Sequence, residues 1–371
     1  MITRRRFACD VGAVAVLGGT CVGELFFANR SRPDDVPRQD VTWLDANENP
    51  AGPPPSALSA IMNSAAAVAR YHFDELAPFN EGIATSEGLA PEQVLPGTGS
   101  AEVINMAIWA FTTSRPLITA TPTYEFPIEL AHTLGRKVIE VPLSESWHFP
   151  VGKLAEEATK AQGGLIYVCN PNNPTSSCTP HKDLRWLANN LPSNTILLVD
   201  EAYIHYVADS ETESAIRFVQ DKCNVVVTRT FSKIYGMAGA RVGFGCAEED
   251  LIRELKRFRS NVIPILGLRA ATAAIGERLT LVPSRRANVA RIRQQLCEWL
   301  LQRNVGYIEP HANFIMIDIG RDARSFGAEM FRRGVAVGRP FASLSQMLRV
   351  TIGSEQEMMR FRDVFWGVYS A

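Results

Sequence analysis

Three short apolar runs, each followed by polar residues, constrain the fold of this chain most. They span residues 164–169, 195–199 and 223–228, and most of their residues are apolar or β-branched. Runs of this length and composition are typical of strands that are buried on both faces. Helix-like stretches alternate with strand-like runs along the body of the chain. This alternation predicts an α/β fold with a mostly parallel sheet.

Composition fits one large or two coupled globular domains. The chain has 371 residues, of which 46% are hydrophobic and 21% charged, and its net charge is −1. A near-neutral chain is unlike the basic proteins that bind nucleic acid by releasing counterions. The seven cysteines show no CxxC spacing and the six histidines are scattered, so no metal site is predicted.

The N-terminal 29 residues read as an export signal. Thr3 is followed by Arg4-Arg5-Arg6-Phe7, and an apolar, glycine-rich segment continues to residue 28. Paired arginines followed by Phe7 resemble a twin-arginine signal, which implies the twin-arginine export machinery as a partner and a periplasmic location. An ordinary secretory signal, or an inner-membrane anchor if the signal stays uncleaved, are the alternatives. Export also implies a compartment in which disulfides can form.

Residues 30–43 are polar and contain proline, and they predict a linker or arm. Further along, helical patterns cover residues 248–260, 263–275 and 285–302. From about residue 305 the pattern changes to that of a small α/β unit.

The residues that follow the third apolar run point to chemistry. Lys233 comes shortly after this run, close in sequence to the hydroxyls of Thr230 and Ser232. Arg241, eight residues later, adds a permanent positive charge. Glycines at 236, 239 and 243 allow tight turns and close approach of the backbone. A primary amine beside hydroxyls and a guanidinium suits a phosphate-bearing aldehyde, because the amine can bond to the aldehyde while the other groups hold the phosphate. Pyridoxal phosphate (PLP) is such a molecule.

This stretch resembles the lysine signature of the fold-type I PLP-dependent aminotransferases, and in particular their histidinol-phosphate aminotransferase-like branch. Further motifs occur in the family's order over about residues 44–366. They include Asn-Glu-Asn-Pro from residue 47, Gly-Thr-Gly-Ser from residue 97, Pro-Thr-Tyr from residue 122, Asn-Pro-Asn-Asn-Pro-Thr from residue 170 and Asp-Glu-Ala-Tyr from residue 200.

The resemblance implies a phosphate site and a ring site for PLP. The phosphate would be held by residues from four places in the chain: Ser100, Ala101, Glu102, Thr230, Ser232, Arg241 and, from the neighbouring subunit, Tyr71. The glycines before Ser100 favour this role, since a helix that starts there exposes unpaired N–H groups. The family often has an acid where this chain has Ala101. Taken alone, Ser100 is equally well a helix cap, and Tyr71 a packing residue.

The ring site would use residues at the ends of the buried strands. Tyr124 would stack on the pyridine ring, Asn173 and Tyr203 would contact the phenolic oxygen, and Asp200 would pair with the ring nitrogen. Without this context Tyr124 is a core tyrosine and Asp200 a helix cap. The family's usual glycine after the Asn173 motif is Ser176 here, which leaves Asn173 in place.

The substrate site would lie beside the ring. Arg349, in Leu-Arg-Val-Thr-Ile-Gly, has the planar fork that binds a carboxylate with two hydrogen bonds. Asn47 belongs to the segment that the family places at the mouth of its active site. Arg339 is a further candidate for the pocket, and so is Asn313.

The resemblance also implies architecture and activity. We expect a large PLP-binding domain over residues 44–275 with a mostly parallel, seven-stranded sheet, to which residues 44–55 contribute the active-site mouth. A small α/β domain covers 276–371, the resemblance implies that both chain ends contribute to it, and the active unit is a homodimer. The reaction is transamination between an amino acid or related amine and a 2-oxo acid, with Lys233, Asp200 and Tyr203 as catalytic residues. Alternatives are other PLP chemistry, namely oxidation, elimination, racemisation or decarboxylation, or a non-catalytic envelope binding protein.

Overall fold

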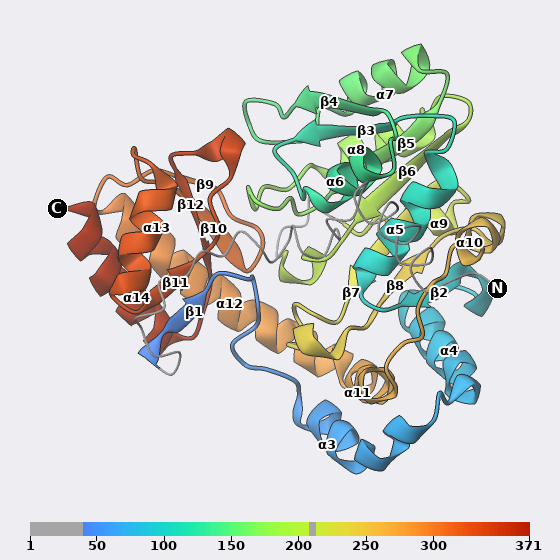
Figure 1. Ribbon diagram of the computed structural model, residues 1–371, viewed down its shortest axis with the longest axis horizontal. Coiled ribbons are helices and arrows are strands. Elements are labelled where there is room, and N and C mark those ends of the chain that lie inside the picture. The colour runs from blue at the N-terminus through green and yellow to red at the C-terminus, as the bar shows by residue number, and fades with distance from the viewer. Residues whose placement is uncertain (1–39, 208–212) are drawn as a thin grey trace, which may run out of the picture.

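The computed structural model describes residues 40–207 and 213–371 (Figure 1). They form a large α/β part, whose sheet is teal, green and yellow in Figure 1, and a small part that is mostly orange and red, with β1 in blue. The long helix α12 (Arg278–Leu301) runs between the two parts. The predicted export signal and most of the predicted linker lie outside the described residues.

A seven-stranded sheet forms the centre of the large part, with the strand order β2-β8-β7-β6-β5-β3-β4. Every pairing among β3 to β7 is parallel, whereas β8 is antiparallel to both of its neighbours. The prediction of a mostly parallel sheet is therefore confirmed. The strands are β2 (Val94–Gly97), β3 (Leu117–Thr121), β4 (Val138–Pro142), β5 (Gly164–Cys169), β6 (Thr195–Asp200), β7 (Val225–Thr230) and β8 (Gly243–Cys246).

The register of the three central strands brings residues at or near their carboxyl ends side by side. Cys169 on β5 pairs with Asp200 on β6, and Asp200 pairs with Thr228 on β7. All residues of β5 and β7 are buried, which explains why their sequences are continuous apolar runs instead of alternating ones. The polar residues that follow these runs consequently gather at one edge of the sheet, where α/β proteins bind ligands.

Helices cover the sheet and bury their apolar sides on it. Helix α5 contacts β2 and the strands from β5 to β8, while α7 contacts β3, β4 and β5. The helices of the large part are α3 (Pro55–Asn63), α4 (Leu76–Glu87), α5 (Ser100–Phe111), α6 (Phe126–Thr133), α7 (Val151–Lys160), α8 (His181–Asn189), α9 (Ile216–Gln220), α10 (Glu249–Lys256) and α11 (Ile265–Gly276).

The small part contains two short sheets. One is antiparallel with the order β12-β10-β9, and in the other β1 pairs with β11 in parallel. Helices α13 and α14 pack on these strands. The elements are β1 (Thr42–Leu44), β9 (Tyr307–Ile308), β10 (Phe314–Asp318), α13 (Ala323–Arg332), β11 (Val335–Val337), β12 (Met347–Thr351) and α14 (Glu355–Tyr369).

Strand β1 differs from the sequence-based expectation. Residues up to 43 were predicted to be linker and residue 44 to begin the large domain, but Thr42–Leu44 pairs with Val335–Val337 of the small part (Figure 1). The strand forms because Leu44 is almost completely buried and the N–H of Thr42 donates to the carbonyl of Gly334 at 2.9 Å. The bounds of the linker therefore differ from the prediction, whereas the small part is built from both ends of the described chain, as the resemblance implied.

Helix α12 begins earlier than its sequence pattern predicts. It starts at Arg278, before Pro283, although a proline inside a helix removes one hydrogen-bond donor. The carbonyl that loses its donor belongs to Leu279, whose side chain is 75% exposed, so water can serve as its partner. The apolar face beyond Pro283, with Val289, Ile292 and Leu296 buried, is as predicted.

Two further observations concern the described residues. Within 40–207 and 213–371, no helix has the length and apolar character needed to cross a membrane. The five cysteines in the same ranges, Cys169, Cys178, Cys223, Cys246 and Cys297, are free thiols.

Candidate active site

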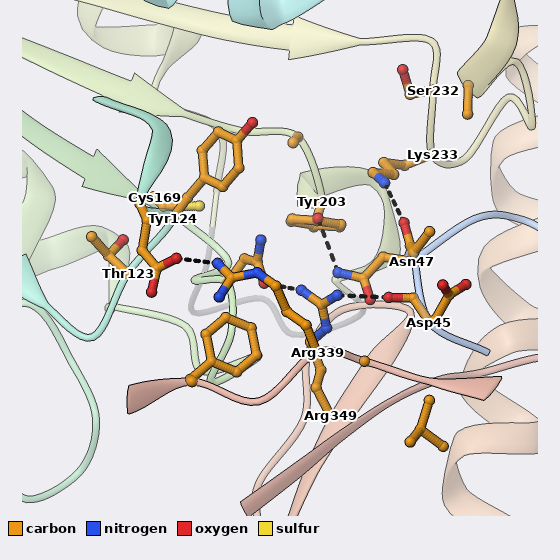
Figure 2. A pocket seen from close by; sticks show the side chains of 18 of the residues that line it. Asp45, Asn47, Thr123, Tyr124, Cys169, Tyr203, Ser232, Lys233, Arg339 and Arg349 are labelled. Carbon is orange, nitrogen blue, oxygen red and sulfur yellow. Dashed lines mark hydrogen bonds and ion pairs between the residues drawn. The ribbon is translucent and has the colours of Figure 1, made fainter. Parts of the chain in front are cut away.

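A cavity of about 510 Å³ lies where the carboxyl ends of the large sheet face the small part (Figure 2). Thirteen of the sixteen predicted site residues line it, although they come from segments far apart in the sequence, and Asn313 is one of the three that do not. They are Asn47, Ser100, Ala101, Tyr124, Asn173, Asp200, Tyr203, Thr230, Ser232, Lys233, Arg241, Arg339 and Arg349. The structure therefore brings the predicted motifs together at one place.

Lys233 follows β7 and carries its amine into this cavity. Its Nζ donates to the carbonyl of Ala46 at 3.0 Å and lies 5.7 Å from the centre of the Tyr203 ring. Burial, together with the positive charges of Arg349 and Arg241, lowers the pKa of Lys233 to about 8. A substantial fraction of this amine is consequently neutral and nucleophilic near physiological pH.

Asp200 ends β6 and is 3% exposed. Its Oδ1 accepts a hydrogen bond from Thr228 Oγ1 at 2.9 Å, and its Oδ2 accepts one from Tyr167 Oη at 3.2 Å. Burial raises the pKa of Asp200 to about 6, and these two donors oppose that rise. The carboxylate is therefore largely ionised at neutral pH and can pair with a buried cationic nitrogen.

Hydrogen-bond donors gather beside the start of α5. Gly99 precedes the helix, and no described side chain caps the first turn, so the N–H groups of Ser100 and Ala101 are open to an anion. Opposite them, Thr230 Oγ1 contacts Ser232 Oγ at 2.9 Å, and Arg241 Nη1 lies 3.4 Å from the same Ser232 oxygen. This set of donors matches the several oxygens of a phosphate group.

Two glycines make this approach possible. A Cβ on Gly99, whose φ is +77°, would lie 2.5 Å from Arg241 Nη2. A Cβ on Gly243 would lie 2.3 Å from the backbone nitrogen of Ser100. Both distances are shorter than any van der Waals contact. Glycine at 99 therefore lets the Arg241 guanidinium approach the start of α5, and glycine at 243 lets β8 lie against the backbone of Ser100.

Arg349 on β12 reaches the cavity from the small part (Figure 2). Its Nη1 donates to Asn173 Oδ1 at 2.7 Å and its Nη2 donates to the carbonyl of Asp45 at 2.8 Å. Among the described residues, none accepts a hydrogen bond from its Nε. Burial lowers the pKa of Arg349 to about 10, which still leaves it charged. The guanidinium is held by neutral oxygens and can exchange them for a carboxylate.

Asn47 and Tyr203 join the two parts of the molecule at the mouth of the cavity. Asn47 Nδ2 donates to Tyr203 Oη at 3.2 Å, and the backbone N–H of Asn47 donates to Thr351 Oγ1 at 2.9 Å. Asn313 holds the same segment, because its Nδ2 donates to the carbonyl of Asn47 at 3.1 Å. Burial raises the pKa of Tyr203 far above its usual range, so its hydroxyl stays protonated.

Arg339 lines the cavity near its exposed end. Its Nη2 forms an ion pair with Glu125, and its guanidinium lies 4.5 Å from the centre of the Phe341 ring (Figure 2). Its side chain is 41% exposed, in contrast to the buried Arg349. Arg339 therefore lies at the border of the site, and Glu125 balances its positive charge.

Two predicted cofactor contacts do not line the cavity. Glu102 is buried, but its carboxylate accepts the backbone N–H groups of Thr98 at 2.6 Å and Asn261 at 2.9 Å. The Glu102 side chain thus holds two loops, and a contact between Glu102 and the cofactor stays a prediction. Tyr71 is 70% exposed and stacks on Phe73 at 5.3 Å, outside the cavity of its own chain.

Sequence reasoning missed other residues of the site. Thr228 and Tyr167, which hold Asp200, were each read only as part of a buried strand. The register could have identified Thr228, since it lies beside the last residue of β6. The wall formed by α13, with Ala323, Gly327 and Phe331, carried no signal because its residues look like those of any packed helix.

Taken together, these groups fit PLP. The donors around Ser100 and Arg241 suit its phosphate, the amine of Lys233 suits its aldehyde, and the buried carboxylate of Asp200 suits its ring nitrogen. Tyr124 lines the same space with its aromatic ring.

Comparison with known proteins identifies the family. Residues 39–365 match the family described as aminotransferase class I and II. The histidinol-phosphate aminotransferase of Moorella thermoacetica is 31% identical over 328 residues, which are 87% of this chain and 84% of that protein. That of Symbiobacterium thermophilum is 33% identical over 336 residues, covering 88% of this chain and 91% of that protein.

Solved structures agree. The crystal structure of histidinol-phosphate aminotransferase from Sinorhizobium meliloti in complex with pyridoxal-5'-phosphate matches with a TM-score of 0.81 and 25% identity, covering 90% of this chain and 93% of that one. An aminotransferase from Mycobacterium tuberculosis, at 22% identity, shares the fold with a TM-score of 0.80 and covers 96% of this chain and 98% of its own.

Proposed function

The chain belongs to the class I and II aminotransferase family, and from this premise we propose how its cavity carries out the reaction. It moves an amino group between an amino acid or related amine and a 2-oxo acid, with pyridoxal 5'-phosphate as its cofactor. The fold is the fold-type I architecture, as the resemblance implied. Bound PLP withdraws electrons from the Cα of an attached amine and makes the Cα proton easier to remove.

One observation carries the proposal: Lys233, Asp200 and Arg349 line a single cavity although they come from β12 and from the ends of β6 and β7. A nucleophilic amine, a buried carboxylate and a buried guanidinium are the groups that hold an aldehyde, a ring nitrogen and a substrate carboxylate. Random placement of these three types in one pocket is improbable, because each costs desolvation energy when buried.

The geometry supports the following cofactor-binding roles. Ser100, Ala101, Thr230, Ser232 and Arg241 hold the phosphate through hydrogen bonds and charge. Tyr124 fixes the plane of the ring by stacking.

Three more residues fix the ring's polar atoms. Asn173 and Tyr203 orient the phenolic oxygen, and Asp200 keeps the ring nitrogen protonated. Because Arg349 holds Asn173 Oδ1 before ligand binds, Asn173 Nδ2 is the atom directed at the cofactor.

Lys233 moves the proton during catalysis. Its Nζ would take the proton from the substrate Cα as general base and then, as general acid, deliver it to C4′ of the cofactor, two bonds away. The lowered pKa of about 8 suits both tasks, since the amine can gain and lose a proton near neutral pH. Arg349 exchanges Asn173 and the Asp45 carbonyl for the substrate carboxylate and so fixes Cα beside Lys233.

A half-reaction screen tests this function. Purified, PLP-loaded protein is mixed with single amino donors, and histidinol phosphate is included because relatives are named for it. We expect stoichiometric pyridoxamine phosphate and a carbonyl product, and a second 2-oxo acid should reverse the reaction. Lys233→Ala should give neither.

Other outcomes identify the rival functions. Release of ammonia or carbon dioxide, consumption of oxygen, or racemised donor without pyridoxamine phosphate would replace transamination by other PLP chemistry. Tight PLP binding with no reaction of any donor would instead favour the non-catalytic envelope binding protein.

We further propose a homodimer. Met62, Val68, Tyr71 and Phe73 are each more than 60% exposed and lie together in sequence along α3, η2 (Ala65–Ala69) and η3 (Phe73–Glu75). Exposed apolar side chains that recur over one segment are typical of interfaces between proteins. In such a dimer Tyr71 reaches the phosphate in the cavity of the partner.

The Thr-Arg-Arg-Arg-Phe start supports export to the periplasm by the twin-arginine route. Export of the folded protein would allow PLP to be loaded in the cytoplasm. A fusion of residues 1–43 to a reporter tests this: changing Arg4 and Arg5 to Lys should stop export. Transport that persists would favour the ordinary secretory route, and a reporter that sediments with membranes would favour an uncleaved anchor.

A further inference from the structure

Asp200 is held by two hydroxyl groups that the reaction itself does not use. Thr228 Oγ1 donates to Oδ1 at 2.9 Å and Tyr167 Oη donates to Oδ2 at 3.2 Å, so each carboxylate oxygen has its own donor. Both donors come from neighbouring strands. Thr228 on β7 pairs with Asp200. Tyr167 on β5 is two residues before Cys169, which pairs with Asp200 on the other side, and both point to the same face of the sheet. Asp200 thus lies between β5 and β7.

These donors occupy a dry part of the molecule. Tyr167 and Thr228 are 0% exposed and Asp200 is 3% exposed. A buried hydroxyl requires a partner, and a buried carboxylate requires donors to remain ionised. The two hydroxyls, together with the backbone N–H of Ala202, therefore satisfy the carboxylate, and their arrangement sets where its oxygens point.

The backbone fixes Tyr167 as well. Thr119 Oγ1 on β3 donates to the carbonyl of Tyr167 at 2.8 Å, and Thr119 pairs with Tyr167 in the register of β3 and β5. Burial also raises the pKa of Tyr167 well above its usual range, so its hydroxyl remains a donor throughout the working pH range. Tyr167 is thus a fixed donor, and it has little freedom to turn away from Asp200.

We propose that Tyr167 and Thr228 are positioning residues for the cofactor: they hold the Asp200 carboxylate as the acceptor for the ring N–H of PLP. This inference rests on the proposed function, since it concerns the ring nitrogen of PLP, which Asp200 contacts only if PLP binds in this cavity. Neither residue touches the reacting atoms, and both act through Asp200.

Removal of either donor should make Asp200 harder to ionise. Burial already raises the pKa of Asp200, and the hydrogen bonds from Thr228 and Tyr167 lower it. Loss of one hydroxyl should move the pH at which Asp200 ionises upward by about one unit, which is about tenfold in its ionisation constant. Other titratable groups face the same carboxylate and stay unchanged in such variants, namely Glu201, Cys169, Tyr124, Tyr203 and Lys233.

The test measures cofactor affinity instead of activity. Dissociation constants of PLP and of its 1-deaza analogue, which has a carbon in place of the ring nitrogen, are measured between about pH 5 and about pH 8. This range includes the pKa of Asp200, which is about 6. The proteins are the unaltered chain, Thr228→Val, Tyr167→Phe and Thr228→Ser. Valine and phenylalanine keep the shape of the side chain, and serine keeps the hydroxyl.

We expect PLP affinity to fall on the acid side with a midpoint that is about one pH unit higher in Thr228→Val and Tyr167→Phe. Thr228→Ser should keep the original midpoint. With the deaza analogue all four proteins should give the same profile, because no ring nitrogen meets Asp200. Unshifted midpoints, or equal shifts with both ligands, would overturn the proposal.

A fifth protein separates this inference from the proposed function. In Asp200→Asn the two ligands should show the same pH profile. If that variant still distinguishes PLP from the analogue as the unaltered chain does, then Asp200 is not the partner of the ring nitrogen, and the proposed function fails at that point.

Discussion

At the scale of single residues, Lys233 is controlled by its surroundings. Its amine is bonded to a backbone carbonyl, lies near the Tyr203 ring and shares the cavity with Arg241 and Arg349. Low polarity and positive neighbours both disfavour the charged form, which is why its pKa falls to about 8. The lysine is thereby prepared to act as a nucleophile and as a proton carrier.

The lowered pKa predicts the pH dependence of Lys233 acylation. The neutral amine reacts, so the initial labelling rate by a small anhydride should rise with pH and level off above about 8 in the PLP-free protein. A free lysine peptide in the same tube should continue to gain reactivity up to about 10.4. Mass spectrometry of the peptide that contains Lys233 measures the rate. Reactivity of Lys233 that follows the free peptide would contradict the lowered pKa.

Arg349 gives a second prediction at this scale. Arg349→Lys keeps the charge but loses the planar fork, so kcat/KM for amino acid donors should fall by at least about tenfold. The matched control is the amine that lacks the carboxylate, whose reactivity should change little. Single-turnover formation of pyridoxamine phosphate measures both. An equal loss for the amine and the amino acid would show that Arg349 supports the fold and not the carboxylate.

Residue types in motifs were predictable because their chemistry is local. Lys233, Asp200 and Arg349 each follow or lie within a recognisable apolar run, and all three line the cavity. The bonds of the Glu102 carboxylate were not predictable, because the sequence around it does not reveal that the N–H groups of Thr98 and Asn261 donate to it. The role of Tyr167 was not predicted, because its partner Asp200 lies on another strand.

At the scale of elements, β6 and β7 organise two polar clusters. Asp200 lines the cavity and Thr228 donates to Asp200 from β7, while the next residues, Glu201 and Arg229, form a second polar network that does not line the cavity. Arg229 Nε donates to Glu201 at 3.0 Å and its Nη1 donates to Glu87 on α4 at 2.9 Å. This network ties the strand ends to a helix and so helps to fix the edge of the sheet that bears the site.

Breaking this network should destabilise the protein. Arg229→Met leaves the buried carboxylate of Glu201 and the half-buried carboxylate of Glu87 without their cation, and the free energy of unfolding should fall by about 3–5 kcal/mol. Arg253→Met on α10 is the control, because its ion pairs with Glu249 and Asp250 are exposed and should contribute less than about 1 kcal/mol. Urea unfolding of the PLP-free proteins measures both. Equal effects would refute the distinction.

Buried elements were the most predictable from sequence. The apolar runs of β5, β6 and β7 clearly predict buried strands, since almost no polar side chain interrupts them before the edge of the sheet. Two elements were not predictable: β1 forms only because β11 lies alongside it, and the start of α12 passes Pro283 where the sequence suggests an interruption. Both depend on tertiary context instead of local preference.

At the scale of the whole molecule, the site exists only where the two parts meet. The large part supplies Lys233 and Asp200, the small part supplies Arg349, and the segment around Asn47 crosses between them. Asn47 bonds Tyr203 on one side and Thr351 on the other, so it couples the positions of the two parts. The proposed dimer adds Tyr71 from a second copy.

Subunit mixing tests the dimer and the role of Tyr71 together. Lys233→Ala and Tyr71→Ala should each be nearly inactive at low PLP. If they are unfolded and refolded as an equal mixture, half of the dimers are mixed and each has one intact site, so about a quarter of the original activity should return. Each variant refolded alone is the control. Activity that does not rise on mixing would mean that Tyr71 does not serve the partner's cavity.

The central claim is that Lys233 carries the cofactor covalently. The most direct measurement is borohydride reduction of the PLP-loaded protein, followed by protease digestion and mass spectrometry of the peptides. The account predicts one phosphopyridoxyl group per chain, located on Lys233. A label on another lysine, or none on a protein that has bound PLP, would contradict it.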